Sequence, residues 1–413
     1  MWARFLFLSC VIFLVRADSY ELKFVQLVTR HGARVPLTPL PNKDAGTVWN
    51  CPETVLLHHD MTGDSSLPLD RIHRVSYIRD RTTFAGNCTV GALTATGCKQ
   101  HQQLGTQFRQ RYVNNGFLPS SFDPSLVYVR STDVPRTKES LQCNLGTFFP
   151  TVQPRRNGGL PVIDIHMMES SAETLLAQSS HCPKISYLLS QTHSSKAWQD
   201  YHATLTQLRA RLCDISGIPD SAFPGYTVYT DGVACRLADG LPMPKGMTPA
   251  DYELLSEVQV RELEMEWGSD EMVTLALGLG AGEIVTNFDE KLKGRLGYKL
   301  MFYSAHDSTV APLQFAFGIW RHNFPDFATS IALELYTNAT GDAFVRTVYS
   351  GREIVPDPCP SPMCPYDIWR RYVTRIVPAD YQKACQLPTA RLQPEGAAPA
   401  SQTKVASSLL ETA

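Results

Sequence analysis

Three short polar motifs in this 413-residue chain contain the residues whose types and spacing could do chemistry. They read "TRHGAR" at 29–34, "VRSTD" at 129–133 and "SAHDST" at 304–309, and each follows a run of apolar residues. Arginines placed this close to a titratable imidazole repel one another and are costly to bury. The motifs therefore indicate a local site built around an anion, because the whole chain has a net charge of only −2.

Phosphate is the anion that these side chains suit best. Arginine forks match phosphate oxygens with two parallel hydrogen bonds, and a histidine can add a further contact. The candidate phosphate-binding residues are Arg30, Arg34, Arg130 and His306.

The remaining two motif residues predict the reaction. A phosphoryl group surrounded by cations is electrophilic, since the charge that develops in its transition state is offset. A neutral His31 imidazole can then attack the phosphorus and form a phosphohistidine. Asp307 is placed to give a proton to the leaving alkoxide, which predicts an acidic pH optimum. The arginines neutralise charge as a metal would, so we expect neither a metal nor another cofactor.

The elements that must position these residues are three strands, expected at 22–28, 126–131 and 298–305. In open α/β sheets, ligands bind beyond the carboxyl ends of the strands, so the three motifs should converge. Helical patterns over 94–113 and 137–149 follow the first two motifs, and 331–337 with 343–350 predicts an antiparallel hairpin. Together these elements predict a doubly wound α/β fold, with a mixed, mainly parallel sheet flanked by helices.

The chain is expected to divide into a split core and an inserted smaller helical domain. Residues 18–165 and 291–386 form the predicted α/β core, and 166–290 the helical lobe. One helix of that lobe begins after Thr248, with Pro249 at its first position. The segment 41–90 has little periodicity and predicts a long excursion, and the Ala-, Pro- and Ser-rich residues 387–413 predict a disordered tail.

The N-terminus predicts export. Arg4, an apolar run and Ala17 are typical of a secretory signal peptide over residues 1–17. That run is shorter than the about 20 residues that span a bilayer, so we expect no stable membrane span. Of the eleven cysteines, Cys10 leaves with the signal, and the even remainder favours disulfides. We also expect glycosylation at Asn87 and Asn338, and a secreted, lysosomal or vesicular location.

The motifs "RHGARVP", "RSTD" and "HD" together resemble the histidine acid phosphatase family over about residues 22–386. Within it, "RHGARVPLTPLP", "VWNCPE", "FAGNCTVGALTATG", "YSAHDSTVAPL" and "CPSPMCPYDIW" are most similar to the lysophosphatidic acid phosphatase type. The resemblance implies that His31 is the phosphorylated nucleophile and that Asp307 is the proton donor. It also implies that the phosphoryl group is held by Arg30, Arg34, Arg130 and His306.

The same resemblance implies a sheet core with a smaller helical domain, and the disulfides Cys359–Cys364 and Cys182–Cys385. The other six cysteines, Cys51, Cys88, Cys98, Cys143, Cys213 and Cys235, are left unassigned.

Three functions remain open at this point. The first is an acid phosphatase for phosphate monoesters, and the second is a narrower lysophosphatidic acid or phytase-like phosphatase. Within 41–90, several acids offset the five cations (Lys43, Arg71, Arg74, Arg79 and Arg81), so the segment is not decisively basic, as a phytase would require. The same segment contains Trp49, Leu56, Leu57 and Tyr77, which could line an apolar groove, and this favours a lipid over phytate. The third is an inactive phosphate-binding or adhesion protein, against which the intact His31 and Asp307 argue. The low net charge argues against a nucleic-acid partner, and a homodimer is a compatible assembly.

Four further patterns have local interpretations. Gly32 is expected to let the backbone turn close to the anion. Asp133 is expected to brace Arg130. The glycines of "GLGAGE" from Gly278 predict a turn at a helix end. The histidine pair at 58–59 lacks metal-ligand spacing.

Overall fold

The computed structural model describes residues 20–44, 46–51, 84–152, 162–176 and 181–388 of the chain. The predicted signal peptide, residues 52–83 of the excursion and all but the first two residues of the predicted tail lie outside the described residues. The histidine pair at 58–59 and the groove residues Leu56, Leu57 and Tyr77 fall in the same part.

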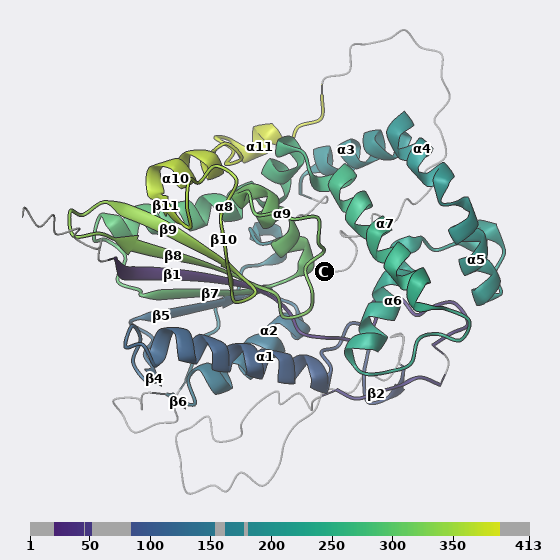
Figure 1. The fold of residues 1–413 in the computed structure, drawn as a ribbon, viewed down its shortest axis with the longest axis horizontal. Coiled ribbons are helices and arrows are strands. Elements are labelled where there is room, and N and C mark those ends of the chain that lie inside the picture. The colour runs from purple at the N-terminus through teal and green to yellow at the C-terminus, as the bar shows by residue number, and fades with distance from the viewer. Residues whose placement is uncertain (1–19, 45, 52–83, 153–161, 177–180, 389–413) are drawn as a thin grey trace, which may run out of the picture.

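A mixed sheet forms the centre of the molecule (Figure 1). The strand order is β10-β9-β8-β1-β7-β5, and β11 pairs with β9. β1 is parallel to β7, and β7 is parallel to β5, whereas β8, β9, β10 and β11 join by antiparallel pairs. The strands are β1 (Glu21–Arg30), β5 (Val127–Ser131), β7 (Leu300–Ala305), β8 (Ser330–Thr337), β9 (Ala343–Tyr349), β10 (Arg352–Ile354) and β11 (Met363–Pro365). The predicted α/β fold class and the hairpin are confirmed.

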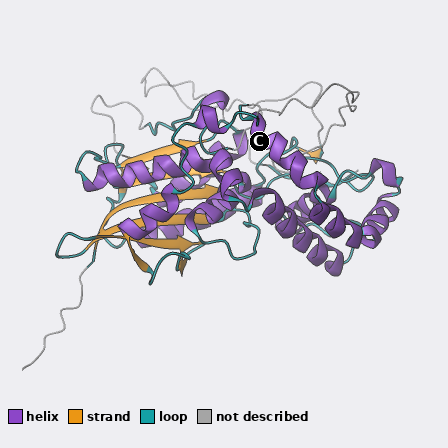
Figure 2. Ribbon diagram, turned by 90° about the horizontal axis from the view of Figure 1, so that it is seen from above, coloured by secondary structure: helices purple, strands orange, loops and turns teal. Residues whose placement is uncertain are grey.

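Helices cover both faces of this sheet (Figure 2). One face packs on α1 (Ala95–Phe108) and α2 (Pro135–Phe148), and the other on α8 (Asp270–Leu292), α9 (Asp307–Phe317) and α10 (Tyr366–Thr374). Side chains alternate along β1, so Val25 and Leu27 face α1 and α2, while Phe24 and Val28 face α8. The last seven residues of β1 are buried, which is typical of a central strand covered on both sides.

A group of helices lies to one side of the sheet and packs around a separate apolar cluster that includes Leu212, Tyr229 and Leu255. The helices between α2 and α8 are α3 (Pro183–Ser194), α4 (Lys196–Thr204), α5 (Thr206–Ser216), α6 (Tyr226–Ala238) and α7 (Pro249–Trp267). α7 begins with a capping box, in which the Thr248 hydroxyl accepts from the Asp251 backbone N–H and the Asp251 carboxylate accepts from the Thr248 N–H. α8 falls inside the range expected for the lobe, yet its buried side chains belong to the sheet's core.

Short elements complete the described residues: β2 (Val48–Trp49), β3 (Ala85–Gly86), β4 (Ser121–Phe122), β6 (Thr151–Val152) and α11 (Tyr381–Ala384), with single helical turns at Arg109–Val113, Ser170–Ala172 and Asp220–Ala222.

Four disulfides join Cys51 to Cys88, Cys98 to Cys143, Cys182 to Cys385, and Cys359 to Cys364. The two pairs that the resemblance implied are therefore present. Cys213 and Cys235 are free and buried, so the expectation that an even number of cysteines would pair holds only for the other eight.

Candidate active site

The carboxyl ends of the three parallel strands meet at one edge of the sheet. Arg30 at the end of β1 lies opposite Ala305 at the end of β7, and Ser131 of β5 lies opposite Ser304. The residues that follow each strand therefore lie close together, and the rings of His31 and His306 are 5.6 Å apart. The structure thus brings the first and third predicted motifs into one place.

His31 is held as a neutral imidazole with a defined tautomer. Its Nδ1 lies 2.8 Å from the Gly32 carbonyl oxygen, and because a carbonyl can only accept, the proton is on Nδ1. The Nε2 lone pair is then free to act as a nucleophile. Burial, followed by the charges of Arg136, Arg30 and Arg34, holds the pKa of His31 well below its usual value.

Asp307, the predicted acid, forms an ion pair with Arg30 in which the two side chains are 2.6 Å apart. Arg30 also donates to the Pro325 carbonyl and lies 4.2 Å from the centre of the Phe327 ring. Burial alone would raise the pKa of Asp307, but the neighbouring charges of Arg30 and Arg34 outweigh it and lower this pKa. In the ligand-free protein the Asp307 carboxyl is therefore ionised at neutral pH, and it must take up a proton before it can act as the predicted acid.

Arg34 reaches the same site and is held by a residue of the helices that pack around Leu212, Tyr229 and Leu255, which we call the cap lobe. Its Nη2 and Nη1 lie 2.8 and 3.0 Å from the two carboxylate oxygens of Asp231 on α6. The Cys235 sulfur, one helical turn further on, lies 3.4 Å from Nη1. No sequence pattern indicated Asp231, because a single aspartate inside a helix of a distant segment looks like an ordinary surface residue.

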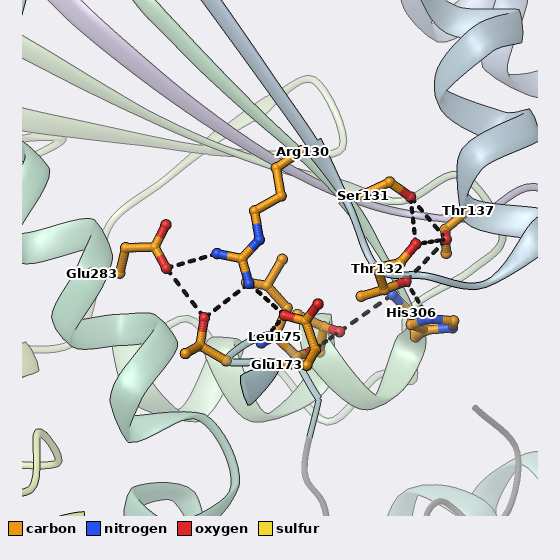
Figure 3. Close-up of polar contacts among 10 residues, drawn as sticks. Arg130, Ser131, Thr132, Thr137, Glu173, Leu175, Glu283 and His306 are labelled. Atoms are coloured by element: carbon orange, nitrogen blue, oxygen red, sulfur yellow. Dashed lines mark hydrogen bonds and ion pairs between the residues drawn. The ribbon is translucent and has the colours of Figure 1, made fainter. Parts of the chain in front are cut away.

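A third arginine at the site comes from the first turn of α2. The Arg136 Nη2 lies 3.2 Å from the Nδ1 of His306, and since a guanidinium can only donate, the proton of His306 is on Nε2. That Nε2 lies 2.8 Å from the Thr132 hydroxyl, which lies 2.9 Å from the Thr137 hydroxyl. Figure 3 shows Thr132, Thr137 and His306 joined in this way. The chain of hydrogen bonds fixes His306 so that it orients Arg136.

The structure does not bring Arg130 into this cluster. Its guanidinium lies among acidic groups beneath the site, 2.5 Å from Glu173 and 2.8 Å from Glu283 of α8 (Figure 3). Arg130 lies within β5, not beyond its end, and its side chain faces α8. The arginine that reaches the site is Arg136, six residues later in "RSTDVPRT". This residue was missed, although an arginine in the first turn of a helix after a parallel strand is a recognisable signal for an anion site.

Arg130 still has a structural connection to the third motif. Glu173 also accepts from the backbone N–H of Leu175, 2.8 Å away, and the Leu175 carbonyl accepts from the Thr309 hydroxyl. Thr309 lies in the first turn of α9, two residues after Asp307. Arg130 thus holds the segment on which this turn rests.

Two of the local interpretations need correction, and a third gains a separate reason. A Cβ atom on Gly32 would lie 2.3 Å from the Gly97 carbonyl of α1, so close packing requires this glycine, whereas its expected role beside the anion stays a prediction. Asp133 accepts from Lys138, 2.8 Å away, and does not brace Arg130. "GLGAGE" lies inside α8, where Gly278 allows close approach to the Ile376 carbonyl.

A cleft of about 1140 Å³ opens above the arginines, between the sheet edge and the cap lobe. Its lining includes apolar side chains from α6, α7 and the loop before β8, such as Val228, Tyr252, Val260, Phe324 and Phe327. Trp49, expected in an apolar groove, is instead buried against Phe84. Among the described residues, no group of histidine, cysteine and acidic side chains is arranged to hold a metal ion, and no helix is long and apolar enough to cross a membrane.

Comparison with known proteins agrees with this geometry. Counting factor 60 of Dictyostelium discoideum is 29% identical over 377 residues, which is 90% of this chain and 90% of that protein. Lysophosphatidic acid phosphatase type 6 of Bos taurus is 29% identical over 90% of this chain and 87% of its own length. The Hafnia alvei phytase structure has the same fold, with a TM-score of 0.61 at 14% identity over 89% of this chain and 99% of that one. Residues 21–350 match the histidine phosphatase superfamily, branch 2, and the chain therefore belongs to this family.

Proposed function

We propose that the protein is an acid phosphatase that hydrolyses phosphate monoesters through a phosphohistidine on His31. The observation that carries the proposal is that a neutral, oriented His31 and the Arg30-bound carboxylate of Asp307 lie in one cluster of arginines. Membership of the histidine phosphatase superfamily supports the same chemistry.

In the first step, the Nε2 lone pair of His31 attacks the phosphorus, and the bond between phosphorus and the ester oxygen breaks. Asp307 gives its proton to the leaving oxygen, so an alcohol leaves and not an alkoxide. In the second step, water attacks the phosphorus, the N–P bond breaks and inorganic phosphate leaves, with the water proton returning to Asp307. Arg30, Arg34 and Arg136 hold the phosphoryl oxygens in both steps.

In this assignment Arg136 takes the role first given to Arg130. His306 has a protein partner on each ring nitrogen. We therefore assign two roles to it: it orients Arg136, and it lies beside the phosphoryl group.

A phosphoenzyme test distinguishes an enzyme from a protein that only binds phosphate. Quenching the protein in alkaline detergent during turnover of a ³²P-labelled aryl phosphate near pH 5 should trap a covalent label on His31 that is stable in base and lost in acid. The variant His31→Ala should show no label and lose phosphate release by at least about 10³-fold, whereas His166→Ala, outside the site, should retain both. Full activity of His31→Ala would rule out the mechanism, and an inactive wild-type protein without label would favour the binding protein.

A second candidate is a narrower enzyme for a phosphate monoester with an apolar tail, as in a lysophospholipid. The observation in its favour is the apolar lining of the cleft from α6, α7 and the loop at 324–327. A lower KM for lysophosphatidic acid than for glycerol phosphate, at equal kcat, would support this substrate. Equal KM values would leave the general phosphatase.

We further propose a location in the secretory pathway, either secreted or in a lysosomal or vesicular lumen. The four disulfides support an oxidising compartment. Glycosylation at Asn87, which is exposed, and at Asn338, in the β8–β9 turn, also stays a proposal, and loss of mass on enzymatic deglycosylation would check it. The homodimer is a proposal that sedimentation would check.

A further inference from the structure

Asp231 is an acidic side chain that the cap lobe inserts into a site otherwise suited to anions. It lies on α6, and its carboxylate receives two hydrogen bonds from Arg34 and one from the Leu37 backbone N–H at 3.2 Å. The side chain is 17% exposed and lines the cleft. Asp231 therefore lies between the segment after β1, which contains His31 and Arg34, and the cleft in which a substrate's leaving group would lie.

The contact with Asp231 sets the orientation of Arg34. The carboxylate occupies the outer edge of the guanidinium, formed by Nη1 and Nη2. The Nε of Arg34 is buried, and within the described residues it has no hydrogen-bond partner. A guanidinium has two edges that can bind an oxyanion, so the edge that contains Nε is left for a phosphoryl oxygen. Cys235 approaches Nη1 from the same helix as an uncharged thiol, and burial raises the pKa of that thiol.

Asp231 also changes the charge of the site. Among the described residues, four arginines line the cleft, and three of them, Arg30, Arg34 and Arg136, lie at the site beside His31. Two of these three already hold a carboxylate, since Arg30 pairs with Asp307 and Arg34 pairs with Asp231. With both histidines neutral, these five side chains have a net charge of +1. That charge suits one phosphoryl group, whereas a second phosphate on the α6 side would meet the Asp231 carboxylate at close range.

We propose that Asp231 is a specificity-determining residue, which orients Arg34 for one phosphoryl group and excludes substrates that place a second anionic group beside α6. The preferred substrate class is then the monophosphate ester with an uncharged leaving group, and polyphosphorylated esters are disfavoured. This inference rests on the proposed phosphatase activity.

The test measures kcat/KM for 4-nitrophenyl phosphate and for inositol hexakisphosphate near pH 5, in the wild type and in Asp231→Asn. The ratio of the second value to the first should rise about tenfold in the variant, because asparagine keeps the shape and removes the charge. The matched control is Asp220→Asn, which removes a carboxylate paired with Arg209, another residue of the cleft lining, and should leave the ratio within twofold. A ratio unchanged in Asp231→Asn, or raised equally in Asp220→Asn, would overturn the inference.

A second measurement uses only the wild-type protein, in case Asp231→Asn does not fold. Inorganic phosphate and tripolyphosphate are compared as competitive inhibitors of 4-nitrophenyl phosphate hydrolysis. We expect tripolyphosphate to bind no more tightly than phosphate, and binding ten times tighter would overturn the role of Asp231. Failure of the proposed function would look different, since the wild type would then release no phosphate from either ester.

Discussion

Replacing Arg136 and Arg130 by methionine, one at a time, should change the free energy of unfolding in opposite directions. Methionine keeps an unbranched apolar stem and removes the charge and the hydrogen-bond donors. Arg136 is buried beside other cations, while Arg130 is buried beside two carboxylates. Arg136→Met therefore removes a repulsion between arginines that a bound phosphate would otherwise relieve. Arg130→Met breaks the ion pairs of Arg130 with the two carboxylates.

The pKa of Arg136 gives the size of the first effect. Burial, followed by the charge of Arg34, lowers this pKa from 12.5 to about 9. At about 1.4 kcal/mol per unit, the charged guanidinium costs the native state on the order of 5 kcal/mol at neutral pH. The lost contact with His306 returns about 1–2 kcal/mol of that. We expect Arg136→Met to raise the free energy of unfolding by roughly 3–4 kcal/mol.

The second effect has the other sign. Glu173 is almost completely buried, and Arg130→Met leaves its carboxylate without the guanidinium that now neutralises it. Removing one partner of a buried ion pair costs about 3–5 kcal/mol. We therefore expect Arg130→Met to lower the free energy of unfolding by that amount.

Urea unfolding at pH 7 without phosphate measures both changes, and kcat/KM for an aryl phosphate near pH 5 measures function. Arg136→Met should lose about 10²–10³-fold in kcat/KM, the usual loss for one donor to a transition-state oxyanion. The folded fraction of Arg130→Met should keep activity within about tenfold. Arg136→Lys is the control that keeps the positive charge and removes the planar guanidinium with its paired donors. Its kcat/KM should lie between those of Arg136→Met and the wild type.

An exchange of behaviour between the two variants would refute the assignment of Arg136 as the phosphate ligand. Loss of activity in Arg130→Met at unchanged stability, with an active Arg136→Met, would make Arg130 the phosphate ligand. A fall in stability for both variants would show that Arg136 is not under repulsion in the ligand-free protein.

Three other predictions concern packing, the acid and pH. Gly32→Ala places a Cβ atom 2.3 Å from the Gly97 carbonyl and should lower the free energy of unfolding by more than about 3 kcal/mol, while Gly146→Ala, in open space on α2, should not; equal urea midpoints would contradict this. Asp307→Asn should reduce kcat more for an alkyl phosphate than for 4-nitrophenyl phosphate, because only the poorer leaving group needs the proton; an equal loss would exclude Asp307 as the acid. Three buried histidines have pKa values below 6.5, so the unfolded state takes up protons at a higher pH than the folded state. The free energy of unfolding should therefore fall between pH 7 and pH 5, by up to about 1.4 kcal/mol per pH unit for each histidine. A melting temperature that stays constant over that range would refute this prediction. The three histidines are His31, His101 and His306.

The sequence predicted the framework because the signals for it are local. The apolar run before "TRHGAR" is long enough to define a buried strand, and Thr94 and Thr248 mark helix starts by their side-chain hydrogen bonds. The convergence of "TRHGAR" and "SAHDST" followed from one general rule about strand ends.

The errors at the site come from side-chain direction and from distant partners. Whether an arginine in a strand points to the ligand or to a helix depends on one residue of register, so Arg130 and Arg136 could not be told apart by proximity to the motif alone. Asp231 and Glu173 are separated from their arginines by long stretches of chain, and their roles come only from tertiary packing. Cys235 remained unpaired for the same kind of reason: the even count says nothing about which sulfurs meet.

The ion pair between Asp307 and Arg30 changes how an acidic optimum should be understood. In the free protein this pair keeps the pKa of Asp307 low, so the acid is not protonated by its own surroundings. A bound phosphoryl group competes for Arg30 and adds negative charge beside Asp307, and both effects raise the pKa of the carboxyl. Phosphate monoesters have a second pKa of about 6, so near pH 5 the substrate itself brings a proton into the site. His31 cannot take that proton because burial and the arginines keep it neutral. In the proposed mechanism we therefore expect the proton to go to Asp307, and we expect low pH to act through the protonation state of the ester more than through that of the free enzyme.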